Sequence, residues 1–356
     1  MSFNRLVADD FVVSTDSITA GLWGDSSTPN LSTFITSSAQ AAGSSGNYYL
    51  NVFSAGTSTG PSELEFAVTY GNSNGGGSLL FDSSVPERSP SSTIYGSYRT
   101  LVLGDETAAF SFGGVTSSDF WAISIDRNRY KESLFPGSLT LIISGSDAAA
   151  GGGMLSLTDN SQIVTTTTFN DAGRVFQIVS GSAGTVFTGV NNNGYSLASG
   201  SYGFFLPDIA TLLLNPRAIT AGNTGVSKSF ADIKPVTTTN TDGNNPGILI
   251  RAISSSANPS PNPALPFTLN SQENITSDFV FVRPRSSEYN YSSNPSFISG
   301  STGEVLFNSF INNPQTYMTT VGLYNDTNEL LAVAKLSRPL PKDFTKEALV
   351  RVKLDF

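Results

Sequence analysis

The chain has 356 residues, contains neither cysteine nor histidine, and carries a net charge of −9. Without thiol or imidazole groups it cannot form a disulfide, a cysteine nucleophile, a Ser–His–Asp triad or a His-ligated zinc site. Residues 1–250 hold 19 acids and 10 bases, which argues against nucleic-acid binding, since phosphate contacts need a basic face. Charged residues make up 13% of the chain, about half the usual share, so its surface suits burial against other proteins.

Short apolar runs separated by turn residues dominate the chain and predict β-strands. The clearest run is 64–70, because Leu64, Phe66, Val68 and Tyr70 alternate with their neighbours and would share one face. Further strands are predicted at 48–53, 99–103, 120–125 and 139–143 and, after a Gly/Ala/Ser-rich loop at 144–153, at 162–168, 174–179 and 185–190.

One segment favours a short helix. Pro207 and Asp208 precede the apolar string IATLLL, and Asn215 and Pro216 follow it. A proline and an acid are typical of the first turn of a helix, and a second proline ends one. This helix would have only about two turns.

These patterns predict a mostly β fold, with two or more β-sandwich-like domains, long loops and at most one or two short helices. Residues 1–234 form the expected N-terminal β region, with a possible break near 144–153. A Pro/Asn/Ser-rich strap or linker is expected at 235–266, because its prolines prevent regular strand pairing. Residues 267–356 form the expected C-terminal β-sandwich-like domain.

The segment 317–338 predicts a β-hairpin. Alternating residues from Met318 to Tyr324 lead into the turn cluster 325–328, and the apolar run from Leu330 to Leu336 is the returning strand. The strings VGLYN and NELLAVAKLS in this hairpin resemble a hairpin found in tail-fibre, collar and baseplate proteins of tailed phages. Asn328 stands where many of those proteins have glycine, a mild change because asparagine tolerates positive φ.

Other strings extend the resemblance to about a third of the chain. They include MSFNRLVADDFVVSTDSIT at the start, IYGSYRTLVLGDE at 94–106, RNRYKESLFPGSLTL at 127–141, SYGFFLPDIATLLLNP at 201–216 and SEYNYSSNPSFISGS at 287–301. The chain therefore resembles virion structural proteins of contractile-tailed bacteriophages, of the cyanophage-like myovirus group. The resemblance implies a virion component, more weakly a tail or baseplate subunit, and it implies no catalytic residues.

Two basic regions are candidate assembly contacts. The first is the strongest basic cluster of the acidic part of the chain, formed by Arg127, Arg129 and Lys131, which would dock an acidic neighbour in a particle. The alternative is a solvated loop paired with Glu132 and nearby acids. The second is the hairpin, with Tyr324, Lys335 and Arg338 as its candidate contacts. The C-terminal bases, which include Lys335, Arg338 and Lys342, are expected to form a solvated or intersubunit face interleaved with acids.

Chemical alternatives carry weaker signals. A glycosidase needs two carboxylates across a cleft, and the side-by-side Asp105 and Glu106 would point to opposite faces, so a surface turn is favoured. The turns 242–245 and 325–328 offer too few oxygens for a calcium loop. Aromatic residues such as Tyr289, Tyr291, Phe297 and Trp121 fit core or interface packing better than sugar stacking.

We therefore expect a non-enzymatic structural subunit of a bacteriophage virion, made in the host cytoplasm and located in the tail or baseplate. A receptor- or glycan-binding tail-fibre module and a capsid decoration or head-fibre protein stay open as alternatives. Other virion proteins are the expected partners, in a symmetric multi-copy assembly. We expect no catalytic residue, cofactor, metal, nucleic acid or membrane span, since no run of about 18 apolar residues occurs.

Overall fold

The computed structural model divides the chain into two compact units. Unit 1 consists of Met1–Ser17 and Asn274–Phe356, and unit 2 consists of Ile18–Glu273. The residues that the structure describes are 4–22, 35–36, 49–53, 63–78, 81–85, 88–144, 154–187, 200, 202–220, 233–237, 245–256, 267–292 and 294–355. Residues 1–17, which we grouped with the N-terminal β region, thus share a unit with the C-terminal part of the chain.

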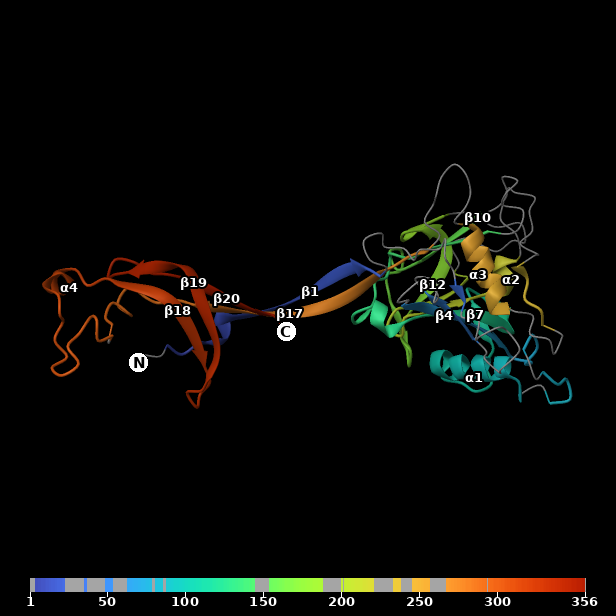
Figure 1. The fold of residues 1–356 in the computed structure, drawn as a ribbon, viewed down its shortest axis with the longest axis horizontal. Helices are drawn as coiled ribbons and strands as arrows, with labels where there is room; N and C mark the ends of the chain where they lie inside the picture. Colours follow the sequence, from blue (N-terminus) through green and yellow to red (C-terminus); the bar gives the residue numbers. More distant parts are fainter. Residues whose placement is uncertain are drawn as a thin grey trace. The chain divides into compact units, whose positions relative to one another are not determined.

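Unit 2 is built on one large antiparallel sheet (Figure 1). Its strand order is β16-β9-β10-β12-β14-β15-β7-β4-β3-β2, and β11 and β13 also pair with β12. In chain order the strands are β2 (Ile35–Thr36), β3 (Tyr49–Phe53), β4 (Leu64–Asn72), β7 (Asp119–Ile125), β9 (Thr140–Ser144), β10 (Met154–Asp159), β11 (Thr168–Asn170), β12 (Gly173–Ser182), β13 (Thr185–Val186), β14 (Gly203–Leu206), β15 (Thr211–Leu214) and β16 (Phe267–Thr268). The prediction of a mostly β fold is confirmed.

Both faces of the central strands are buried, because successive side chains point to opposite sides of a strand. On one face Phe120 and Leu213 pack with helix α1 (Pro90–Leu103) and the hairpin β5 (Phe110–Phe112)–β6 (Val115–Ser117). On the other face Trp121 and Leu212 pack with helix α3 (Asn245–Ser256). Figure 1 shows α1 and α3 on opposite sides of β4 and β7.

Helix α1 stands where we predicted a strand at 99–103, and that prediction is wrong. Local signals fix both ends of the helix: the Ser89 side chain accepts a hydrogen bond from the amide of Ser92, Pro90 occupies the first turn, and Gly104 ends the helix with φ +63°. Tyr95 and Val102, seven residues apart, lie on its buried side. The apolar run at 99–103 is the last turn of this helix rather than a strand.

The helix predicted at 208–214 is also wrong, because Thr211–Leu214 form β15 after a turn at Pro207–Ala210. The strand lies between β14 and β7, and Leu212, Leu213 and Leu214 are completely buried. Such a run can be strand or helix from its pattern alone. Here the pairing with β14 and β7 makes it a strand, and the layers that contain α1 and α3 bury its two faces. A short helix, α2 (Pro216–Ile219), follows with Asn215 as its N-cap.

Part of the expected strap at 235–266 is helix α3, so the extended strap is wrong for 245–256. Leu249, Ala252 and Ile253 of this helix are buried in the main core of unit 2. Pro246 lies in the first turn of this helix, and the later prolines of the segment, at 259–266, lie outside the described residues. The predicted strand at 162–168 is wrong except at Thr168, because Ser161–Ile163 form turns. Of the strand expected at 185–190, Thr185–Val186 form β13 and 188–190 lie outside the described residues.

Unit 1 combines a small sheet with a long hairpin. The sheet has the order β1-β17-β20, and Ser277–Val282 of β17 pair with Val350–Asp355 of β20. The elements are η1 (Ala8–Asp10), β1 (Phe11–Gly21), β17 (Asn270–Val282), α4 (Asn308–Asn312), β18 (Thr316–Tyr324), β19 (Leu330–Lys342) and β20 (Val350–Asp355). The chain passes between the units within β1 and β17, and Ser271–Gln272 of β17 pair with β8 (Ser133–Leu134) in unit 2.

Candidate functional site

The hairpin β18–β19 has one packed face and one exposed face. On the packed face, Val321, Leu323, Ala334 and Leu336 lie against the core of unit 1. The residues between them point outward, because Gly322 pairs with Val333 and Val321 pairs with Ala334. The predicted hairpin 317–338 is therefore present, and its outward side is open to solvent.

The outward side carries an apolar surface that we call the hairpin face: Tyr324, Leu330, Leu331 and Val333. Their exposed fractions are 39%, 53%, 68% and 58%, respectively. Gly322 lets the Tyr324 ring and Leu330 pack over β18, because an added Cβ would lie 2.9 Å from that ring and 3.4 Å from Leu330 Cδ1. Isolated exposed leucines are ordinary, but a contiguous apolar surface of this kind is typical of an interaction site.

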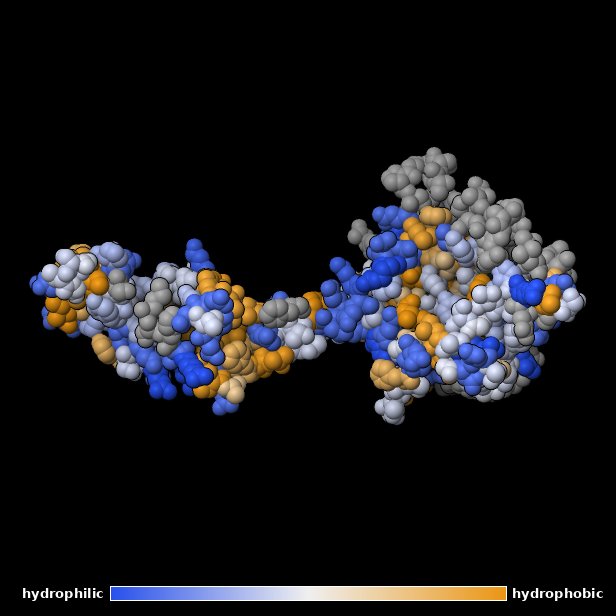
Figure 2. Space-filling view, turned by 90° about the horizontal axis from the view of Figure 1, so that it is seen from below, coloured by the Kyte–Doolittle hydropathy of each residue, from blue (hydrophilic) through white to orange (hydrophobic). Residues whose placement is uncertain are grey.

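The rest of unit 1 also exposes apolar side chains and buries few of them. Its buried apolar core consists of Val280, Val350 and Val352, with partly buried side chains packed around it. Fifteen of the twenty-two large apolar side chains exposed in the described part of the chain belong to unit 1. Figure 2 shows the resulting hydrophobic areas, in orange, on the part of the molecule at the left. A unit with so small a core gains little from burying its own surface, so further burial against a partner would stabilise it.

The two ends of the hairpin face carry opposite charges. Asp326 and Glu329 are exposed at the turn, and Lys335 and Arg338 are exposed further along β19. The turn itself is well ordered by Asn325, whose Oδ1 accepts hydrogen bonds from the amides of Thr327 (3.1 Å) and Glu329 (2.7 Å). Asn328 adopts φ +61°, which confirms that this position needs a residue tolerant of positive φ.

The basic cluster at 127–131 divides into residues with different surroundings. Arg129 is held inside unit 2: its Nη2 lies 2.9 Å from Glu63 and 3.0 Å from the nearly buried Glu65, and its Nε donates to the Leu64 carbonyl. Arg127 stacks on the Tyr130 ring and donates to the Tyr130 carbonyl, yet stays exposed, as does Lys131. Only Arg127 and Lys131 are thus free to meet another molecule without breaking an ion pair of the fold.

Lys342 is not on a surface, which corrects the expectation that it belongs to a solvated or intersubunit basic face. Its side chain is completely buried. Its ammonium donates three hydrogen bonds, to the Ser286 carbonyl (2.8 Å), Asn290 Oδ1 (2.8 Å) and the Asp343 carbonyl (3.0 Å). The loop 286–290 thus wraps around this cation, and Lys342 fixes a loop of unit 1 that the sequence pattern did not connect to it.

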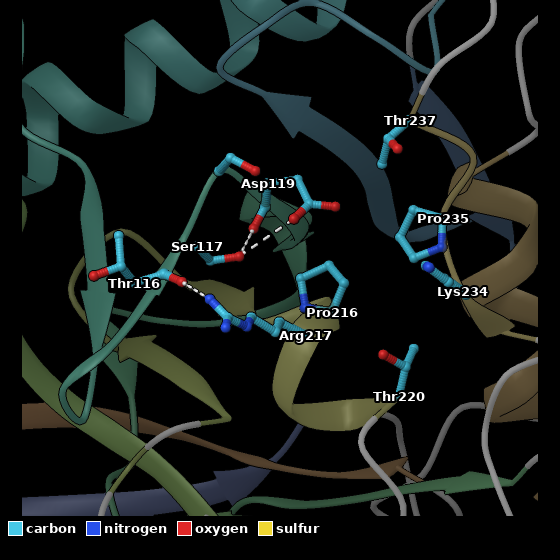
Figure 3. A pocket seen from close by; sticks show the side chains of 10 residues that line it. Thr116, Ser117, Asp119, Pro216, Arg217, Thr220, Lys234, Pro235 and Thr237 are labelled. Carbon is cyan, nitrogen blue, oxygen red and sulfur yellow. Dashed lines mark hydrogen bonds between the residues drawn. The ribbon is translucent and has the colours of Figure 1, made fainter. Parts of the chain in front are cut away.

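Unit 2 contains a polar cavity of about 310 Å³ (Figure 3). Ser117 and Asp119 line one side, Pro235 and Thr237 the opposite side, and α2 contributes Arg217. Thr116, Ser118, Pro216, Thr220 and Lys234 complete the lining.

Asp119 is the one carboxylate among the ten lining residues, all of which the structure describes. Tyr70 Oη donates to its Oδ2 at 2.9 Å and Ser117 Oγ donates to its Oδ1 at 3.2 Å. Burial raises the pKa of Asp119, and these hydrogen bonds oppose that rise. Tyr70 lies on β4 and Ser117 on β6, so Asp119 holds the start of β7 against these two strands. The sequence offered no signal for this group.

The remaining chemical candidates form ordinary structural contacts. Asp105 caps a surface turn by accepting hydrogen bonds from the amides of Thr107 and Ala108, and these bonds hold its pKa below the usual value. Trp121 is completely buried and donates to the Asn245 carbonyl, as core packing predicts. Tyr291 and Phe297 form an edge contact within unit 1. In the described part of the chain, no three acidic side chains cluster as metal ligands would; the turn 242–244 lies outside it.

Comparison with models of protein families, with curated proteins and with solved structures finds no match to this chain. Among the helices that the structure describes, none has the length and apolar character needed to cross a membrane.

Proposed function

We propose that this chain is a non-catalytic structural subunit of a bacteriophage virion, located in the tail or baseplate. The observation that carries the proposal is the hairpin face on a unit whose buried apolar core is three valines. Such a surface is stable when covered by a neighbour, and few charges must be desolvated on this chain, which is 13% charged. The resemblance of the hairpin sequence to those of tail and baseplate proteins supports the position in the particle.

The contacts of the fold divide the candidate assembly residues into two groups. Tyr324, Lys335 and Arg338 belong to the hairpin, where they are exposed together with apolar neighbours. Arg127 and Lys131 form a second, smaller contact surface on unit 2. Arg129 supports that surface from within through its ion pair with Glu65. We propose the hairpin as the main assembly contact, because its apolar area is what association buries.

The proposal is tested by locating the chain in purified particles of the phage that encodes it. Mass spectrometry of particles should detect the chain, and antibody labelling should place it on the tail or baseplate. Particles that lack the chain, or labelling confined to heads, would contradict the proposal.

Two variants test whether incorporation of the chain into particles depends on the hairpin. Leu331→Asp places a charge on the hairpin face, and Phe169→Asp places one on an equally exposed position of unit 2, since the two side chains are 68% and 70% exposed. We expect the Leu331 variant to fold but to be lost from particles, and the Phe169 variant to be incorporated like the wild type. Equal incorporation of both variants would contradict the assembly role of the hairpin.

A further inference from the structure

The hairpin face and its two charged ends form a surface that is complementary to itself. The apolar residues lie in the middle, the acids Asp326 and Glu329 at the turn, and Lys335, opposite Thr320, at the other end, with the exposed Arg338 three residues further along β19. We infer that the hairpin face binds the same face of a second copy of this chain, with the two hairpins antiparallel about a two-fold axis. This inference rests on the proposed assembly role and names the partner of its main contact.

Charge complementarity selects a second copy over other partners. A rotation of 180° about an axis through the middle of the face exchanges its ends, so the acidic turn of each copy meets the basic end of the other. A partner of uniform charge would meet like charge at one of the two ends, which opposes binding. From Leu330 to Lys335 the strand advances by about 16 Å, about twice the screening length at physiological salt, so each end makes its own contact.

The middle of the face supplies the apolar area that a two-fold contact buries. Leu331 and Val333 project outward from β19 and are more than half exposed. In the antiparallel arrangement the two-fold axis runs across the strands, so β19 of each copy lies against β19 of the other. Leu331 and Val333 of the two copies then meet, which buries the most exposed apolar side chains of the hairpin face.

Paired charge reversals test this arrangement in the full-length chain. One variant carries Asp326→Lys and Glu329→Lys, so both ends of its hairpin are basic. The other carries Lys335→Glu and Arg338→Glu, so both ends are acidic. All four residues are exposed, and far-UV circular dichroism checks that each variant is folded. A matched control, Arg88→Glu, reverses an exposed base of unit 2 that belongs to neither proposed contact surface.

Sedimentation equilibrium gives the dimer dissociation constant of each protein. We expect the wild type and the Arg88 control to dimerise equally, each charge-reversed variant to dimerise at least about tenfold more weakly, and an equimolar mixture of the two variants to form a heterodimer. A wild type that is monomeric over the whole concentration range overturns the inference. So does a wild-type dimer whose strength neither reversal changes, since that dimer uses another surface.

The outcome is separable from that of the proposed function. A chain present in purified tails but monomeric in solution, with no recovery on mixing the variants, would leave the virion role standing and remove the two-fold contact. A chain that dimerises through the hairpin face but is absent from purified particles would support the two-fold contact and contradict the virion role.

Discussion

The rings of Phe66 and Phe267 meet edge to face in the core of unit 2, with centroids 5.6 Å apart and an interplanar angle of 82°. Phe66 lies on β4 and Phe267 on β16, and six strands separate these two in the order of the sheet. A flat sheet would hold them far apart, at about 4.8 Å per strand. The sheet therefore curls, and α3, which contacts both β4 and β9, fills its concave side.

This contact predicts a measurable coupling between the two phenylalanines. Phe66→Ala and Phe267→Ala each remove a completely buried ring and should lower the free energy of unfolding by about 3–5 kcal/mol. The double variant should lose less than the sum, with a coupling of about 0.5–1.5 kcal/mol from the ring pair. Denaturant titration followed by tryptophan fluorescence measures this, because Trp121 lies in the main core of unit 2. Additive losses would show that the rings do not interact.

Asn245 joins three segments of unit 2 and should be essential to its stability. Its Nδ2 donates to the carbonyls of Gly77 and Val236, and its Oδ1 accepts from the Val236 amide, all at 2.9–3.2 Å. Asn245→Ala leaves these buried backbone groups without that partner and should lower the free energy of unfolding by about 3 kcal/mol. Asn128→Ala, at an exposed position, should change it by less than about 0.5 kcal/mol. An equal effect of both variants in denaturant titration would refute the role of Asn245.

Lys342→Met should destabilise unit 1, although it removes a buried charge. The Asn290 Oδ1 and the Asp343 carbonyl keep their positions and lose their donor, so we expect a loss of about 2–3 kcal/mol. Lys346→Met is the matched control, because the Lys346 ammonium is half-exposed and its ion pair with Asp343 should contribute less than about 1 kcal/mol. Hydrogen exchange of the β19 and β20 amides measures the stability of unit 1 directly, because both strands belong to it. Unchanged exchange in the Lys342 variant would contradict the prediction.

The carboxylate of Asp343 should make unit 1 sensitive to acid. Hydrogen bonds from the Thr345 hydroxyl, the Thr345 amide and Lys346 lower the pKa of Asp343 from 3.8 to about 2, and the bond from the hydroxyl has the largest effect. A carboxyl whose pKa falls on folding stabilises the folded state at every pH above its pKa in the unfolded chain. This stabilisation is lost as the pH falls from 3.8 towards 2.

Carboxyl-carbon NMR with labelled aspartate measures this pKa. Thr345→Val removes the strongest hydrogen bond, so the pKa of Asp343 should rise towards 3.8. An unchanged titration in the Thr345 variant would show that the hydroxyl is not the main cause.

Removing the Arg129 side chain should lower the free energy of unfolding more than removing the Arg127 side chain. Arg129→Ala deprives the nearly buried Glu65 of its cation and should lower the free energy of unfolding of unit 2 by about 1.5–3 kcal/mol. Arg127→Ala, at an exposed position, should have an effect below about 0.5 kcal/mol. Thermal unfolding of the two variants compares them, and equal losses would contradict this division. An assembly test of the basic cluster should therefore reverse Arg127 and Lys131 and leave Arg129 intact.

The sequence also shows where pattern alone is ambiguous. The apolar run at 99–103 contains the branched side chains typical of a strand, yet Ser89, Pro90 and Gly104 fix a helix around it. These capping residues flank the run in the sequence, so the sequence alone contains the information that predicts the helix. At 211–214 no local signal decides between helix and strand, because the pairing with β14 and β7 and the burial of both faces by the layers that contain α1 and α3 come from distant parts of the chain.

Local alternation and turn chemistry by themselves determined the strands at 64–70 and 120–125 and the hairpin around Asn328, because those choices depend on neighbouring residues only. The tertiary structure alone decided the burial of Lys342, the capture of Arg129 by Glu65 and the contact of Phe66 with Phe267. Each of these joins groups far apart in the chain or depends on how the surrounding chain packs. Their free energies depend on desolvation, which a sequence pattern does not report.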